Sequence, residues 1–167
     1  MSFVAPPALR PGDVVAVVAP SGPFERSNFE LGLKLLAARY RPLFTEGLFA
    51  QARYLAGDDA RRGAELNHAL TDSGVKAVFA ARGGYGLARL LATLQLGSPR
   101  PVVGFSDVTA LHAALQVKGR RSLHGPVLTQ LGRQPPECVE RLFSLLESPT
   151  PPAPFEGGGG FIGRLPA

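Results

Sequence analysis

Short apolar runs alternate along the chain with stretches of helical periodicity. Three of these runs, at 13–19, 75–81 and 101–105, are rich in β-branched residues and are bounded by glycine or proline. A run that is apolar at nearly every position is typical of a strand buried on both faces of a parallel sheet. Weaker strands are expected near 40–44 and 122–123.

Apolar residues three or four positions apart fill the segments between the strands and predict helices there. The expected helices cover 27–39, 60–70, 87–96 and 107–117, and a last helix opens at Pro135-Pro136. Ser27 or Asn28 is expected to cap the first helix, and the acidic Gly57-Asp58-Asp59 segment the second. Strands that alternate with helices predict an α/β fold, a three-layer domain in which helices cover both faces of a parallel sheet.

Composition narrows the classes of protein that remain. The 167 residues suit one compact domain, and the 20 Gly and 16 Pro indicate many turns. With 45% hydrophobic and 19% charged residues, disorder is excluded. A single cysteine, Cys138, excludes an internal disulfide framework and a cysteine-based zinc site. No apolar run approaches the roughly 20 residues that span a bilayer, and the N-terminus lacks a basic leader, so we expect a cytoplasmic protein without membrane contact.

The net charge of +5 comes mainly from arginines scattered along the chain, with pairs only at Arg61-Arg62 and Arg120-Arg121. Proteins that bind nucleic acids concentrate positive charge on one stripe or carry a recognisable module. Neither feature occurs, so we expect no nucleic-acid partner and interpret the charge as a contribution to solubility.

In parallel sheets, ligand-binding and catalytic residues lie at the carboxyl ends of the strands. Four loops follow the predicted strands, at 20–23, 82–86, 105–107 and 124–126.

Ser106 lies at the junction of a strand and a helix, in the segment Gly104-Phe105-Ser106-Asp107. A sharp turn there would expose the hydroxyl above the sheet, and the backbone N–H groups that follow could hold an oxyanion, as in a nucleophile elbow. The second glycine of Gly-x-Ser-x-Gly is absent. The local residues alone favour the alternative, in which Ser106 is a helix N-cap and Asp107 complements the helix dipole.

The second glycine-rich loop is Arg82-Gly83-Gly84-Tyr85-Gly86. Glycines let the backbone approach a ligand, and exposed N–H groups favour a phosphate or a developing oxyanion. The loop matches neither a dinucleotide fingerprint nor a P-loop, and a tight strand-to-helix turn explains it equally well. Arg82 could bind a carboxylate as a bidentate fork.

A serine nucleophile needs a base within hydrogen-bond reach, and the chain offers three histidines. His112 lies about 9 Å along the helix from Ser106 and is rotated away from it. His68 is expected in solvent on another helix. His124 follows the next strand and could approach the same edge of the sheet, although a structural role is the commoner one. The residues therefore supply no convincing triad.

Five motifs in order resemble the LD-carboxypeptidases, also called murein tetrapeptide carboxypeptidases, a family of serine peptidases. The matching segments are Leu9-Arg10-Pro11-Gly12-Asp13 running to Val18-Ala19-Pro20-Ser21-Gly22, Tyr54-Leu55-Ala56-Gly57 with Arg61 and Leu66-Asn67, Ala81-Arg82-Gly83-Gly84-Tyr85-Gly86, Gly104-Phe105-Ser106-Asp107-Val108-Thr109-Ala110-Leu111-His112, and His124-Gly125-Pro126. The resemblance covers nearly the whole chain and favours Ser106 as a nucleophile.

The resemblance implies a fold of the flavodoxin-like or class I glutamine amidotransferase-like type. It implies an enzyme that releases the terminal D-alanine of murein tetrapeptides during cell-wall recycling in the cytoplasm, often as a dimer, without a metal or other cofactor. Ser106 would be the nucleophile, and the N–H groups of Asp107 and of Gly83 and Gly84 the oxyanion hole. Arg82, Tyr85 and Ser21 would bind substrate. Related peptidases inactivate a peptide–nucleotide antibiotic, so the substrate stays open.

The family's catalytic glutamate and histidine belong to a second, C-terminal domain. We expect 1–147 to form the N-terminal nucleophile domain, and the Pro/Gly-rich 148–167 to be a linker and the start of that second domain. The chain alone is then expected to be nearly inactive, and its tail to favour self-association. Two alternatives remain: a related peptidase for another peptide or acylated amine, and a non-catalytic module that binds peptides or anions.

Overall fold

The computed structural model describes residues 4–150, which form one five-stranded sheet. The strands are β1 (Val14–Val18), β2 (Arg41–Leu43), β3 (Ala77–Ala80), β4 (Val102–Gly104) and β5 (Leu123–His124). Every pair of neighbours is parallel, in the order β2-β1-β3-β4-β5. This confirms the predicted parallel sheet, and the order is that of flavodoxin-like folds, which reverses direction between β1 and β3.

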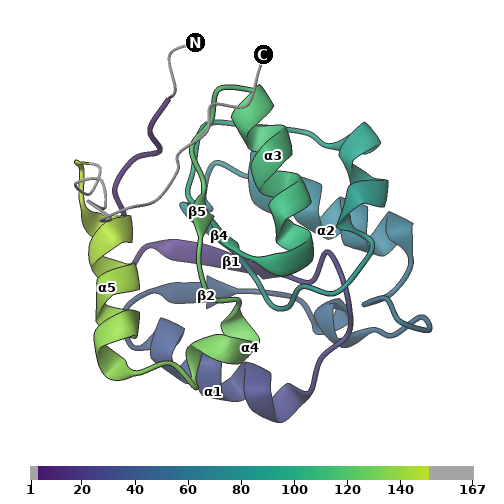
Figure 1. Cartoon of the computed structure of the whole chain (residues 1–167), viewed down its shortest axis with the longest axis horizontal. Helices are drawn as coiled ribbons and strands as arrows, with labels where there is room; N and C mark the ends of the chain where they lie inside the picture. Colours follow the sequence, from purple (N-terminus) through teal and green to yellow (C-terminus); the bar gives the residue numbers. More distant parts are fainter. Residues whose placement is uncertain (1–3, 151–167) are drawn as a thin grey trace, which may run out of the picture.

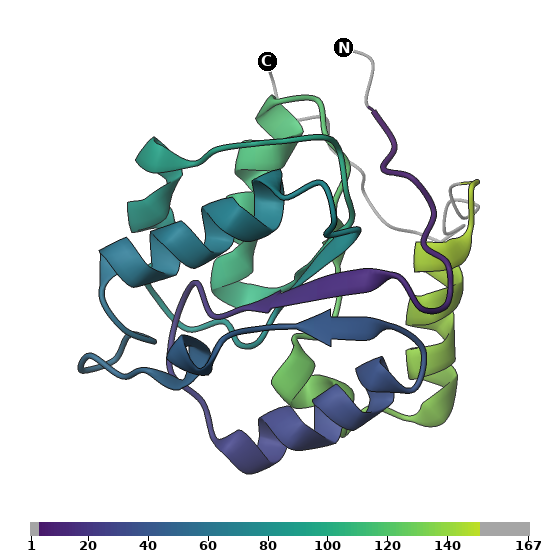
Figure 2. The same ribbon diagram turned by 180° about the vertical axis from the view of Figure 1, so that it is seen from behind.

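Helices cover both faces of the sheet, which makes the domain three-layered (Figures 1 and 2). One face carries α1 (Arg26–Ala37), α4 (Leu128–Leu131) and α5 (Pro136–Glu147). The other carries α2 (Asp59–Thr71), the 3-10 helix η2 (Leu87–Thr93) and α3 (Thr109–Val117). Two further 3-10 turns, η1 (Glu46–Phe49) and η3 (Ser106–Val108), lie in the connections.

Alternating residues of the central strand supply the two halves of the core. Val15 and Val17 pack with the side chains of α1, α4 and α5, whereas Ala16 and Val18 pack with those of α2, η2 and α3. Successive side chains of a strand point to opposite faces, so a strand covered on both sides must be apolar at every position. The uninterrupted apolar run of the sequence therefore reflects double burial.

The structure corrects two local predictions and adds two short elements that were not predicted. The segment expected as a helix over 87–96 is a 3-10 helix, in which Leu87 and Leu90 fall on one buried face three residues apart. The first helix is preceded by Glu25 without a side-chain cap, so neither Ser27 nor Asn28 caps it. The short helices η1 and α4 were not predicted, because four residues are too few to show a helical period of apolar positions.

Other predictions of helix ends are confirmed. The Asp58 side chain caps α2 by accepting the Arg61 N–H at 2.7 Å, and α5 begins with Pro136 at its first turn. Within residues 4–150 no helix has the length and hydropathy to cross a bilayer. The expected linker at 148–167 lies outside the described residues from position 151 onward, as does most of the tail proposed for self-association.

Candidate functional site

Three loops meet at the carboxyl ends of β1, β3 and β4. The Gly22 N–H, after β1, donates to the carbonyl oxygen of Gly83, after β3, at 3.1 Å. These two loops flank the point where the strand order reverses, and it is there that sheets of this type bind ligands. The loops after β1 and β3, which the sequence placed at the carboxyl ends of strands, are therefore in direct contact.

Ser106 is exposed and opens the turn η3 with φ +65°. A non-glycine residue in the left-handed region is strained, and such strain gathers at functional sites. The Ser106 hydroxyl makes no capping hydrogen bond, and Phe105 precedes the turn instead. The N-cap interpretation of Ser106 is therefore wrong. The observed geometry is a sharp strand-to-helix turn that presents the hydroxyl to solvent.

Gly83 packs directly against Ser106. A Cβ atom built on Gly83 would lie 3.0 Å from the Ser106 Oγ and only 2.8 Å from the Ser106 Cβ, and the second distance is shorter than real Cβ contacts. Gly84 has φ +121°, and a Cβ there would lie 3.2 Å from the Gly22 nitrogen. Only glycine fits both positions. Among the described residues, the backbone N–H groups of Gly83, Gly84 and Asp107 have no hydrogen-bond acceptor, so they are available to one.

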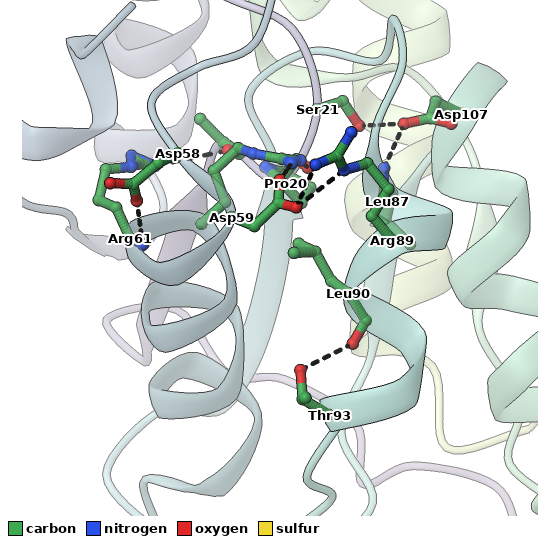
Figure 3. Close-up of polar contacts among 12 residues, drawn as sticks. Pro20, Ser21, Asp58, Asp59, Arg61, Leu87, Arg89, Leu90, Thr93 and Asp107 are labelled. Carbon is green, nitrogen blue, oxygen red and sulfur yellow. Dashed lines mark hydrogen bonds and ion pairs between the residues drawn. The ribbon is translucent and has the colours of Figure 1, made fainter. Parts of the chain in front are cut away.

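The Asp107 side chain joins all three loops, as Figure 3 shows. Its Oδ2 accepts the Ser21 hydroxyl at 2.7 Å and the Leu87 N–H at 2.9 Å. Ser21 has no exposed surface. The substrate-binding role that the resemblance implies for Ser21 stays a prediction; in this structure its hydroxyl is buried and bonded to Asp107. The sequence predicted a backbone oxyanion role for Asp107 or a charge that complements a helix dipole, but not these hydrogen bonds of its carboxylate.

Arg82 and Tyr85, which the sequence predicted to bind substrate, are exposed beside one hollow of about 380 Å³. The Arg82 guanidinium donates to the carbonyl oxygen of Pro23. The Tyr85 ring meets the ring of Tyr54 edge to face, with centroids 5.6 Å apart. Arg53, a strained residue with φ +57°, lines the same hollow. Arg53 and Tyr54 are site candidates that the sequence reasoning did not single out.

Buried charges on α2 hold the end of β1 behind this site. Arg62 is fully buried and donates to the carbonyl oxygen of Pro20 and to the Asp59 carboxylate. Glu65 accepts the Ala19 N–H at 2.8 Å, and burial raises the pKa of its carboxyl. Figure 3 shows Asp59 beneath Pro20, on the side of the loop that faces α2. Buried charges are retained only when paired, so these contacts fix the position of the 20–23 loop.

None of the histidines supplies an evident base for Ser106. His112 donates from Nε2 to the carbonyl oxygen of Gly104 at 2.8 Å, so its Nδ1 accepts the Ser122 hydroxyl, also at 2.8 Å. Burial lowers the pKa of His112, and both ring nitrogens are engaged. His68 is exposed near Asp72, as predicted, and His124 contacts the ring of Phe105. Within residues 4–150 no three His, Cys, Asp or Glu side chains gather as metal ligands would.

The fold and the turn define an α/β protein with a strained, exposed serine at the switch-point edge of a parallel sheet. Residues 15–125 match the model of the LD-carboxypeptidase N-terminal domain. The chain belongs to the LD-carboxypeptidase family, which confirms the resemblance drawn from the motifs.

Curated relatives agree with this assignment. A putative carboxypeptidase of Synechocystis is 40% identical over 161 residues, covering 93% of this chain and 53% of the relative. The murein tetrapeptide carboxypeptidase of Pseudomonas aeruginosa is 43% identical over 105 residues, 58% of this chain and 34% of that protein. A probable murein peptide carboxypeptidase of Bacillus subtilis is 36% identical over 130 residues, 74% and 41% of the two chains. The chain thus spans about half the length of its relatives or less.

Solved structures share the fold. The wild-type apo form of MccF, the microcin C7 self-immunity protein, superposes with a TM-score of 0.80 at 22% identity, covering 87% of this chain and 47% of MccF. An MccF-like protein of Bacillus anthracis gives a TM-score of 0.77 at 26% identity, with the same coverage.

Proposed function

We propose that this chain is the nucleophile-bearing part of a serine LD-carboxypeptidase, with Ser106 as the nucleophile. One observation carries the proposal: Ser106 is exposed at φ +65° with Gly83 packed against its side chain. The turn aims the hydroxyl away from the sheet, and the free N–H groups of Asp107, Gly83 and Gly84 lie on the loops that surround it. A strained serine beside unpaired backbone donors is the arrangement that acyl transfer needs.

The proposed reaction follows from these groups. The Ser106 Oγ attacks the carbonyl carbon of the scissile amide while its proton passes to a base. The carbonyl oxygen becomes an oxyanion, and the N–H groups of Asp107 and the Gly83-Gly84 segment stabilise it. The C–N bond then breaks, the leaving amine takes the proton, and water hydrolyses the acyl-serine.

The base is the part that these residues do not supply. Within the described range His112 has both ring nitrogens occupied. We therefore keep the expectation that a glutamate and a histidine of a second domain complete the triad, with 1–147 as the nucleophile domain and 148–167 as the linker. Triad members act as a unit, so the 167-residue chain alone should release almost no D-alanine. Release that depends on Ser106 would contradict this and would point to His124.

For the substrate we propose a murein tetrapeptide, from which D-alanine is released. Support comes from the relatives named as murein peptide carboxypeptidases in Pseudomonas and Bacillus. Murein recycling takes place inside the cell, so we also propose a cytoplasmic enzyme; a homodimer remains part of the same proposal, to be tested by light scattering.

A second candidate substrate is a peptide linked to a nucleotide. MccF has been solved with aspartyl sulfamoyl adenosine. In this chain the exposed Tyr54 and Tyr85 rings beside the hollow offer faces on which a base could stack. The two substrates are separated by joining residues 1–150 to the C-terminal part of the Synechocystis relative. Release of D-alanine from the tetrapeptide, without cleavage of aspartyl sulfamoyl adenosine, supports the first; the reverse supports the second.

A further inference from the structure

A second hollow, of about 410 Å³, lies between α3 and β5 and is separate in its lining from the hollow at Arg82. Thr109, His112 and Gln116 line it from α3. These residues follow one another at spacings of three and four, so they share a face of the helix about 10 Å long. We call this hollow the α3–β5 groove.

The two ends of the α3–β5 groove differ. Because α3 runs antiparallel to the strands, Thr109 and His124 lie at the end next to the Ser106 turn, where His124 is in register with Gly104. Arg120 and Arg121 lie at the opposite end, beyond the C-terminus of α3. Their backbones are held in place, since the Arg120 N–H donates to Leu115 at 2.9 Å and the Arg121 N–H to Val4 at 3.3 Å.

The charge of the α3–β5 groove is uncompensated within the described part of the chain. None of its lining residues is acidic. The side chains of Arg120 and Arg121 make no hydrogen bond or ion pair with described residues, although Arg39 and Arg89 elsewhere bind Glu147 and Asp59.

The middle of the groove offers no charged side chain to a ligand, so an anionic ligand group would bind at the arginine end. His112 is neutral between Gly104 and Ser122, because burial lowers its pKa and its two ring nitrogens are satisfied. Two guanidinium groups without a partner among residues 4–150, half-buried at Arg120 and exposed at Arg121, remain beside the hollow. Guanidinium groups bind planar and tetrahedral oxyanions through paired N–H donors.

We propose that the α3–β5 groove binds a ligand whose carboxylate or phosphate group is held by Arg120 and Arg121. The remainder of such a ligand lies along α3, past Ser122, toward the end of the groove beside the Ser106 turn. The proposal does not depend on the proposed function, because it rests on the groove and its charges and not on the reactivity of Ser106.

The test is a titration of the ¹⁵N-labelled 167-residue chain, followed by its amide chemical shifts, with inorganic phosphate in one arm and acetate in the other at constant ionic strength. We expect saturable shifts at the amides of Gln116, Ser122 and His124. A response to phosphate alone indicates a phosphate group on the ligand, a response to acetate alone indicates a carboxylate, and a response to both shows that the groove accepts either oxyanion. The absence of saturable shifts at these amides in both arms would overturn the proposal.

Substitutions then assign the binding to the arginines. Arg120→Gln with Arg121→Gln should weaken the binding about tenfold or more, because each charge-assisted bond contributes strongly. The exposed Arg121→Gln alone should weaken it several-fold and guards against loss of folding in the double variant. Arg41→Gln, an exposed arginine on β2 at the opposite edge of the sheet, is the matched control. Unchanged affinity in the arginine variants would contradict the proposed site.

Discussion

The Ser21 hydroxyl donates to the Asp107 carboxylate at 2.7 Å across 86 positions of the chain. This bond ties the loop after β1 to the turn after β4, and the Leu87 N–H adds the loop after β3 on the same carboxylate oxygen. The strained Ser106 immediately precedes Asp107. The side chain of Asp107 therefore fixes the relative positions of the loops that make the proposed site.

Breaking this bond should destabilise the domain. Ser21→Ala leaves Asp107 with one partner fewer and should lower the free energy of unfolding by about 1 kcal/mol, and Asp107→Ala by about 1–3 kcal/mol because two buried donors lose their acceptor. Urea unfolding measures both, and a double-mutant cycle should give a coupling of at least about 0.5 kcal/mol. Ser98→Ala, at an exposed serine, is the control. Additive effects of the two substitutions would show that the bond contributes nothing.

Gly83→Ala tests the close approach to Ser106. The new methyl group would lie 2.8 Å from the Ser106 Cβ, so the turn must move, at a cost of about 1–3 kcal/mol. Gly63→Ala on α2 is the matched control, since its methyl group would meet only Leu90, at 3.8 Å. In the helix interior that change should stabilise by up to about 1 kcal/mol. Equal effects of the two substitutions on the urea midpoint would contradict the packing described here.

Ser106→Gly should stabilise the chain. An L-residue in the left-handed region costs roughly 1–2 kcal/mol relative to glycine, and the greater freedom of glycine in the unfolded chain offsets part of this. The expected net gain is about 0.5–1 kcal/mol by urea unfolding. Ser106→Ala keeps the Cβ and should be nearly neutral. A loss of stability in the glycine variant would mean that the backbone at φ +65° is not strained.

Because of Glu147, the free energy of unfolding of the domain should fall at acid pH. Its hydrogen bond with Arg39 holds the pKa of the carboxyl below its ordinary value of 4.5. The unfolded chain therefore binds this proton more readily, so the stabilisation is complete above about pH 5 and is lost as the pH falls through the lower, folded-state pKa. In Glu147→Gln the urea midpoint should therefore fall less between pH 6 and pH 3 than it does in the unsubstituted chain. Glu30→Gln, at an exposed glutamate, should leave the dependence of the urea midpoint on pH unchanged. An unchanged dependence in Glu147→Gln would contradict a stabilising role for the Glu147 carboxylate.

The strands could be predicted because double burial requires continuous apolar runs, which are visible without a structure. The 3-10 form of η2 could not, since Leu87 and Leu90 are three residues apart in either kind of helix. The location of Ser106 and Gly83 followed from strand ends and motifs. Their direct contact, and the strained backbone at Ser106, depend on how two distant loops pack.

The buried polar contacts could not be predicted from the sequence. Arg62 belongs to the scattered positive charge that was interpreted as a contribution to solubility, yet it has no exposed surface and donates to the Pro20 carbonyl oxygen. Nor does its local pattern show that Ser21 is fully buried, with its hydroxyl on the Asp107 carboxylate. A polar residue in a loop has the same local sequence pattern whether its partner is solvent or a distant side chain, so only the tertiary structure distinguishes the two.

The role of Ser106 as the nucleophile is tested most directly in the fusion of residues 1–150 to the C-terminal part of the Synechocystis relative, with D-alanine release from a murein tetrapeptide as the readout. Circular dichroism and size exclusion first establish that the fusion and its Ser106→Ala variant fold alike. If Ser106 is the nucleophile, Ser106→Ala should lower kcat about a thousandfold or more. A folded Ser106→Ala variant that releases D-alanine within about threefold of the unsubstituted fusion would show that Ser106 is not the nucleophile.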